Sequence, residues 1–440
     1  MSADSAGAEQ SSKLGGRNVF AVVLGNALEF YDFGVYAAFA VFIGQKFFPS
    51  TDPYVSLLLS VATFGVGFVS RPLGGLLLGA YADKHGRKAA MTLTLTLMAL
   101  GTAAIGLIPA YSEIGLAAPL LLVLARLLQG FAAGGELGAS TVYLYEAAPP
   151  GKKCLTGSWQ LASQGAASIL VGLIGYGIAR LLSAEDAASW GWRIPFLMGI
   201  LIIPVGIYIR RNLNETLAQE TAHATTGGVI NALVRDHLGS LLLAIGAFSG
   251  ITIAQYFLIY LTSFAINTLH MPASTAQLAN FAVGASTLVF ALLGGWLGDR
   301  FGLRLISILP RILLLLLIYP LVLILVQAPS ALALLGGAAL LTAFQASSAA
   351  LVVLLIARSF PRKVRATGLA TAFGLGAALF AGTAQVIFTW LISVTGDPTS
   401  PVMYVIAMNV LSLVSIWLMP RAEAPEPKAD PVIAGNVIIQ

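Results

Sequence analysis

The sequence predicts an all-α membrane protein with twelve transmembrane helices in two six-helix halves, and three observations carry this prediction. The chain has 440 residues, of which 58% are hydrophobic and only 10% are charged, whereas about a quarter of a soluble domain is charged. Apolar runs long enough to cross a bilayer recur along the whole chain. The same loop motif also follows an apolar run in each half of the chain, which indicates an internal repeat.

The apolar runs and the loop signals between them predict twelve spans. They lie near residues 19–43, 55–82, 89–109, 117–146, 154–182, 193–210, 238–265, 275–298, 305–327, 330–357, 366–394 and 401–419. The chain therefore divides into a tail (1–18), a first half (19–210), a linker (211–237), a second half (238–419) and a proline-containing tail that we expect to be disordered (420–440).

The basic residues predict the orientation. Most of the 24 Lys and Arg fall in the termini and loops of one side, which the positive-inside rule assigns to the cytoplasm. Both termini are then cytoplasmic, in the inner (plasma) membrane. Residues 1–18 lack the apolar core and cleavage site of a secretory signal peptide. Because the basic residues sit in short loops, they do not predict nucleic-acid binding.

The first span carries two carboxylates, Glu29 and Asp32, within the stretch GNALEFYDFGVY. Asn26, Glu29 and Asp32 follow at three-residue steps and share one broad helix face. A carboxylate inside the membrane is costly unless it faces protein or water, so it marks an ion or proton path. The alternative is that these acids only hold helices together by hydrogen bonds.

Arg126 of the fourth span lies at the depth of these acids. At ~1.5 Å per residue, Glu29 is about 15 Å, Asp32 about 20 Å and Arg126 about 16 Å from the inner surface. An unpaired Arg or Asp at this level costs at least ~2.5 to 3.5 kcal/mol, so a mutual partner is expected. Arg71 and Glu136 form a second expected pair in the inner half. Buried ion pairs can also serve packing alone.

Uncharged polar residues share helix faces in four other places and complete the predicted substrate site, although such residues more often serve helix packing. With Asn26 and Arg126, the predicted substrate-binding residues are Gln129, Gln160, Gln164, Gln255, Tyr256, Tyr260, Gln345 and Ser348. Histidines lie only in loops or at span ends, and the second half has no mid-span carboxylate. The predicted proton carriers are therefore Glu29, Asp32 and Glu136. A substrate anion on Arg126 would free an acid to hold a proton.

Two motifs resemble a known family. The sequence from Gly79 to Lys88, its second copy from Gly295 to Arg304, and Arg126-Leu-Leu-Gln129-Gly130 are similar to the major facilitator superfamily. Within it, GNALEFYDFGVY and Arg71-Pro-Leu-Gly resemble the metabolite:proton symporters, and RLLQGFAAGGELGASTVYLYEAAPPGKK resembles citrate and tricarballylate proton symporters. The resemblance implies that spans one, four, seven and ten surround a central cavity.

The repeated loops would then form the cytoplasmic gate. Asp83 can bond Arg87 and meet the helix that begins near Arg365, and Glu146 is placed for Arg87 or Lys88. Asp299 and Arg304 hold the matching positions in the second half. Topology-setting positive charge would explain the basic residues of these loops but not the aspartates.

We therefore expect a proton-coupled importer of a small carboxylate, with citrate or a related tricarboxylate as the best guess, acting as a monomer. The alternatives are a symporter for a zwitterion such as proline or betaine, a dicarboxylate carrier, or a non-transporting receptor. No metal-ligand spacing, nucleophile motif or phosphate loop predicts an enzyme, a metal or a cofactor.

Overall fold

The structure, a computed structural model, is a helical bundle described over residues 3–85, 87–134, 151–200, 235–361 and 365–419, with a few single positions between these ranges. In the first half the helices are α1 (Ala3–Ala38), α2 (Ala40–Phe47), α3 (Pro53–Val69), α4 (Arg71–His85), α5 (Arg87–Leu107), α6 (Tyr111–Ile114), α7 (Ala117–Ala133), α9 (Lys153–Leu181), α10 (Ala184–Ser189) and the 3₁₀ helix η1 (Gly191–Arg193). In the second half they are α13 (Leu238–Asn267), α14 (Ala273–Phe301), α15 (Leu303–Gln327), α16 (Ala331–Arg358), α17 (Arg365–Gly376), the π-helix η2 (Ala377–Ala381), α18 (Gly382–Thr395) and α19 (Ser400–Leu418).

The described helices follow the predicted spans and confirm the fold class. Eight of them are long and apolar enough to cross a membrane, and the bent pair α1 and α2 can supply a ninth span within the described ranges. Spans five, seven to ten and twelve correspond to α9, α13 to α16 and α19, whereas span two comprises α3 and α4. The second part of span four, the second half of span six except for residue 204, most of the linker and residues 420–440 lie outside the described residues.

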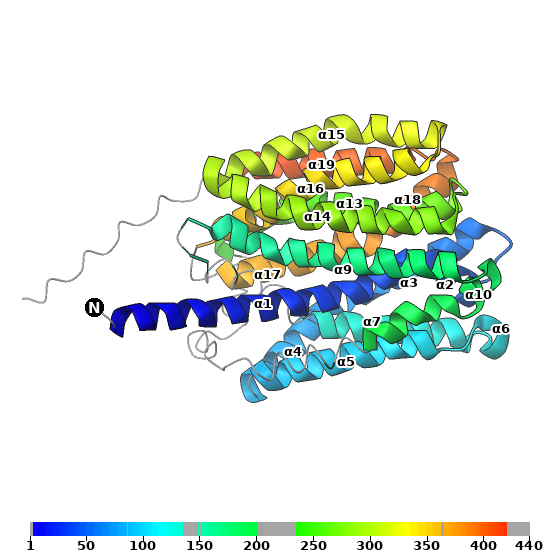
Figure 1. The fold of residues 1–440 in the computed structure, drawn as a ribbon, viewed down its shortest axis with the longest axis horizontal. Helices are drawn as coiled ribbons and strands as arrows, with labels where there is room; N and C mark the ends of the chain where they lie inside the picture. The colour runs from blue at the N-terminus through cyan, green and yellow to red at the C-terminus, as the bar shows by residue number, and fades with distance from the viewer. Residues whose placement is uncertain are drawn as a thin grey trace, which may run out of the picture.

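The first span differs from the expectation in length and shape. Helix α1 already begins at Ala3, and its first turns project beyond the rest of the bundle (Figure 1). The chain then breaks at Phe39, and the two helices meet at a bend of 60°. After the bend α2 packs closely on α3, since a Cβ atom on Gly44 would lie 2.7 Å from the Ser56 carbonyl oxygen.

The two halves meet along a seam between α9 and α14, which lie side by side in Figure 1. Small residues let these backbones approach. A Cβ atom on Gly165 would lie 2.7 Å from the Gly284 carbonyl oxygen, and the reverse distance is also 2.7 Å. The seam thus depends on glycine in both helices.

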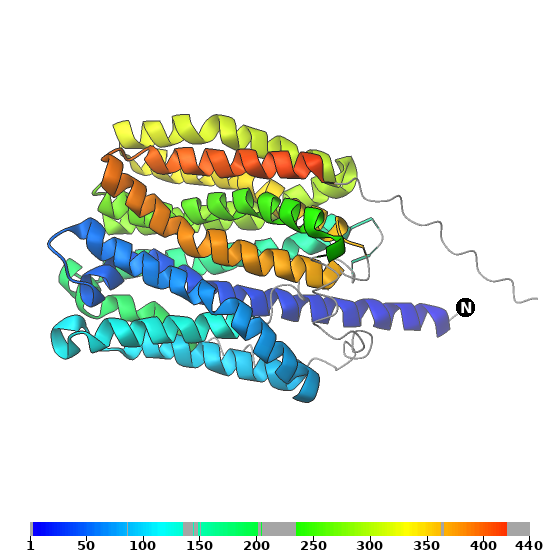
Figure 2. The same cartoon turned by 180° about the vertical axis from the view of Figure 1, so that it is seen from behind.

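A second seam joins α3 and α18, the pair seen from behind in Figure 2. Here Gly65 packs directly on the backbone of Gly382.

The helices differ in how much of their most apolar stretch is buried inside the protein. This stretch is 67% buried in α13 and 72% buried in α16, but only 28% buried in α15. Hence α13 and α16 lie inside the bundle, and α15 presents a wide face to lipid.

Candidate substrate and proton site

A cavity lies between the two halves and encloses about 110 Å³, several times the ~10 to 15 Å³ that one water molecule needs. The first half contributes α1, α3, α4 and α9 to its wall, and the second half contributes α13, α14, α16, α17 and η2. Most of the wall is apolar. Its polar side chains are Arg71, Gln160, Gln164, Ser168, Thr252, Gln255, Tyr256, Asn280 and Gln345.

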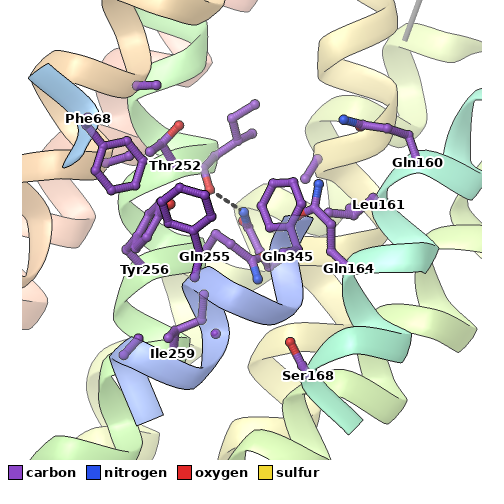
Figure 3. Close-up of a pocket in the computed structure, with 18 of the residues that line it drawn as sticks. Phe68, Gln160, Leu161, Gln164, Ser168, Thr252, Gln255, Tyr256, Ile259 and Gln345 are labelled. Carbon is purple, nitrogen blue, oxygen red and sulfur yellow. Dashed lines mark hydrogen bonds between the residues drawn. The ribbon is translucent and has the colours of Figure 1, made fainter. Parts of the chain in front are cut away.

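Five of the predicted substrate-binding residues line this cavity. Gln160 and Gln164 reach it from α9, Gln255 and Tyr256 from α13, and Gln345 from α16 (Figure 3). The amide nitrogen of Gln345 donates a 2.6 Å hydrogen bond to the Ile251 carbonyl, which fixes the orientation of its side chain. The polar faces of three separate helices therefore meet in one place.

Among the described residues, Arg71 is the cation on the cavity wall. It is 6% exposed, and its guanidinium carbon lies 4.5 Å from the centre of the Phe33 ring and 4.3 Å from that of Phe68. Glu29 and Tyr256 are close enough to act on it electrostatically. Glu29 is thus the described acid within electrostatic reach of Arg71, whereas its expected partner Glu136 lies outside the described residues.

Arg126 lies behind the cavity wall and is connected to Asp32 through a chain of hydrogen bonds. Arg126 Nη1 donates to Gln129 Oε1 at 2.7 Å, and Gln129 Nε2 donates to Thr102 Oγ1 at 2.8 Å. The Thr102 hydroxyl donates to Asp32 Oδ2 at 2.9 Å. The expected partnership of Arg126 and Asp32 thus exists as a relay, and Arg126 itself is fully buried.

Thr102 is the residue of this relay that the sequence analysis missed. The residue type alone does not mark a threonine in an apolar span as part of a functional site. Its depth would have suggested it, because at ~1.5 Å per residue from Arg87 it lies about 22 Å from the inner surface, near the level of Asp32.

Three further residues of the predicted site serve helix contacts in this structure. Asn26 donates to the Gln160 carbonyl at 2.8 Å and to the Ser163 hydroxyl at 2.7 Å, which ties α1 to α9. Tyr260 accepts a hydrogen bond from Thr389 at 3.1 Å. Neither of these two residues, nor Ser348, lines the cavity as described.

Ser348 is the third, and it belongs to a separate polar cluster in the second half. It accepts from Arg311 Nη2 at 3.2 Å and donates to the Ser307 carbonyl at 2.6 Å. Arg311 also donates to Asn409 at 2.7 Å. These bonds join α15, α16 and α19, away from the cavity wall.

The described part of the predicted gate contains one contact between the halves. Asp299 of α14 accepts hydrogen bonds from the backbone N–H groups of Cys154 at 2.8 Å and Leu155 at 3.0 Å, at the start of α9. Arg304 instead donates to the Trp417 carbonyl at 2.6 Å and so caps α19 within its own half. The other predicted gate side chains lie outside the described part: Asp83, Arg87, Lys88, Glu146 and Arg365.

Known proteins resemble the chain over most of its length. A family model described as Sugar (and other) transporter matches residues 18–231, and one described as Major Facilitator Superfamily matches residues 243–439. A citrate-proton symporter of Klebsiella pneumoniae is 38% identical over 387 residues, which are 87% of each chain. The chain belongs to the major facilitator superfamily. This facilitator is a multi-pass membrane transporter and not an enzyme.

Two further relatives of this facilitator differ from each other in the substrates that their names give. A citrate-proton symporter of Salmonella typhi is 36% identical over 87% of this chain and 89% of its own. A glycine betaine/proline/ectoine/pipecolic acid transporter of Dickeya dadantii is 32% identical over 94% of this chain and 85% of its own. The crystal structure of a D-xylose-proton symporter superposes with a TM-score of 0.76, covering 92% of this chain and 98% of its own at 18% identity, which supports the fold alone.

Proposed function

We propose that this facilitator is a proton-coupled symporter that imports a small carboxylate, with citrate or a related tricarboxylate as the best candidate. One observation carries the proposal: a cavity between the two halves holds Arg71 on its wall, with the buried carboxylate of Glu29 within electrostatic reach of it. A guanidinium suits a carboxylate ligand, and a titratable acid next to it suits proton coupling. The two relatives of highest identity quoted above are citrate-proton symporters.

Charge balance suggests how the coupling operates. The cluster of Glu29, Asp32, Arg71 and Arg126 carries no net charge when both acids are ionised. Each ionised substrate carboxylate adds one negative charge to a low-dielectric space, and protonation of one acid offsets one such charge. The loaded cavity, with part of the substrate charge offset by the proton, then lets the two halves rock about their seams, which is the alternating access of repeat-built transporters.

The roles and orientation follow the sequence prediction. Glu29 and Asp32 are the proton carriers, with Glu136 as the third candidate, and both termini face the cytoplasm. Gln160, Gln164, Gln255, Tyr256 and Gln345 contact the substrate from the cavity wall. Asp299 belongs to the cytoplasmic gate, because it joins the second half to the start of α9.

A zwitterion such as betaine or proline is the second candidate, because aromatic rings line the cavity and Glu29 lies within electrostatic reach of Arg71 on its wall. A quaternary ammonium binds on ring faces within about 6 Å. Phe33 and Phe68, however, already hold the Arg71 guanidinium. This arrangement favours the carboxylate.

Uptake by purified protein in proteoliposomes tests the proposal. Labelled citrate and labelled proline are compared with and without an imposed proton gradient, acidic outside. Accumulation of citrate only with the gradient is expected. Gradient-driven accumulation of proline without citrate would establish the alternative, and accumulation of neither would refute both.

A further inference from the structure

We propose that Arg71 is the residue that anchors a substrate carboxylate, and that Glu29 is the acid which this carboxylate displaces from Arg71. On this assignment Arg126 is a positioning residue that holds Asp32 through Gln129 and Thr102. The inference rests on the proposed carboxylate function and assigns the residues of that site.

Access distinguishes the two arginines. Arg71 lines the cavity, whereas Arg126 is fully buried and has one donor on Gln129 and one on the Phe64 carbonyl. A molecule that enters the cavity meets Arg71 first. Arg126 would have to give up its bond to Gln129 before it could bind substrate in the same way.

The aromatic surroundings of Arg71 suit an anionic ligand. Phe33 and Phe68 lie against the guanidinium carbon, which orients the planar group and leaves the N–H edge for a two-point carboxylate contact. Its Nε atom is buried and has no hydrogen-bond partner among the described residues. A substrate carboxylate would give this Nε atom the partner that it lacks. The Nε atoms of Arg126 and Arg311 lack one too, so the place of Arg71 on the cavity wall is what distinguishes it.

The two arginines also need anions beside them. Both guanidinium groups contact the Phe33 ring, at 4.5 Å for Arg71 and 5.0 Å for Arg126. Two cations around one ring repel each other strongly in a low-dielectric interior. Glu29 compensates Arg71 when the cavity is empty, and a substrate carboxylate replaces it there. The displaced Glu29 then takes a proton from the external medium.

The competing explanation is that Glu29 and Arg71 form an ion pair that only stabilises packing. The two explanations differ in the effect of Glu29→Gln on binding. If Glu29 competes with substrate for Arg71, removing its charge strengthens citrate binding. If the pair only supports packing, removing one partner leaves a buried charge uncompensated and weakens binding together with stability.

The test measures citrate dissociation constants of purified variants in detergent, with thermal unfolding as the check of folding. Arg71→Lys is expected to weaken citrate binding at least tenfold, which corresponds to about 1.4 kcal/mol, because an ammonium cannot make the two-point contact. Arg126→Lys is expected to weaken it less than threefold. Arg311→Lys, a buried arginine away from the cavity, is the matched control and should change it less than twofold.

The acids supply the second half of the test. Glu29→Gln is expected to bind citrate at least threefold more tightly than wild type. Asp32→Asn, one helical turn away, should show no such gain because Asp32 is bonded to Thr102. If Arg71→Lys does not fold, the neutral double variant Arg71→Gln with Glu29→Gln replaces it and should fold without binding citrate.

Two outcomes overturn the assignment: wild-type citrate affinity in the Arg71 variant that folds, or weaker binding in Glu29→Gln. A larger loss in Arg126→Lys than in Arg71→Lys would move the anchor to Arg126. Failure of the proposed function is a separate result, since in that case wild-type protein binds neither citrate nor tricarballylate.

Discussion

The carboxylate of Asp299 accepts a hydrogen bond from the backbone N–H of Cys154 at 2.8 Å, and this bond joins the two halves of the transporter. The carboxylate also accepts a second hydrogen bond, from the Leu155 N–H at 3.0 Å, so that both of its oxygens contact α9. The first N–H groups of a helix lack partners within the helix, and an anion there also meets the positive end of the helix dipole. Movement of α14 away from α9 must break both bonds.

Asp299→Asn is expected to change the rate of transport at least threefold and to leave citrate binding within threefold. The amide keeps one acceptor but loses the charge that favours the helix N-terminus. Initial uptake rates and detergent binding constants check this. Asp397→Asn is the control, because Asp397 bonds Thr399 in its own loop. A large affinity loss in Asp299→Asn would place Asp299 in the binding path.

The sequence was sufficient to predict most of the fold, since a transmembrane helix must satisfy its backbone internally and be apolar over its full length. The runs from 238 to 419 therefore match helices α13 to α19 closely. The bend at Phe39 was not predictable in this way, because no proline or glycine marks it. It depends on the packing of α2 against α3, which is a tertiary contact.

The candidate site was predicted in part. Spacing placed Gln160 with Gln164, and Gln255 with Tyr256, on shared faces that do reach the cavity. Depth also placed Arg126 at the level of Asp32, but depth does not give direction around the helix axis. Which arginine faces the cavity, and which lies behind aromatic rings, depends on how the helices rotate when they pack.

Thr102→Val is expected to destabilise the protein by about 1 to 3 kcal/mol, because it leaves two buried polar groups without their partner. These groups are Asp32 Oδ2 and Gln129 Nε2. The temperature of thermal unfolding and the rate of gradient-driven uptake should both decrease. Thr102→Ser keeps the hydroxyl and should restore both, and equal defects in the Val and Ser variants would contradict the relay.

Gly165→Ala is expected to reduce transport at least tenfold by forcing α9 and α14 apart. The added Cβ would lie 2.6 Å from the Leu288 backbone nitrogen, and backbone cannot yield as a side chain can. Gly177→Ala, in the same helix with nothing within 4 Å of its Cβ, is the matched control. Similar uptake by the two variants would argue against a tight seam at Gly165.

The double variant Glu29→Gln with Asp32→Asn is expected to uncouple citrate transport from proton transport. The amides keep the shape of the side chains but cannot titrate, so uptake against a citrate gradient should stop. Counterflow of labelled for unlabelled citrate needs no net proton movement and should persist. Because two acids one turn apart can share a proton, either single variant can keep partial coupling. If the double variant still accumulates citrate, the proton path must use Glu136.

The central claim, that citrate and protons move together, is tested most directly by the internal pH of proteoliposomes during downhill citrate entry. An inward citrate gradient is imposed without a pH gradient, in sodium-free buffer, and a trapped pH indicator is recorded. The account predicts internal acidification that follows citrate uptake in time and is absent from protein-free vesicles. Citrate entry without acidification would contradict it.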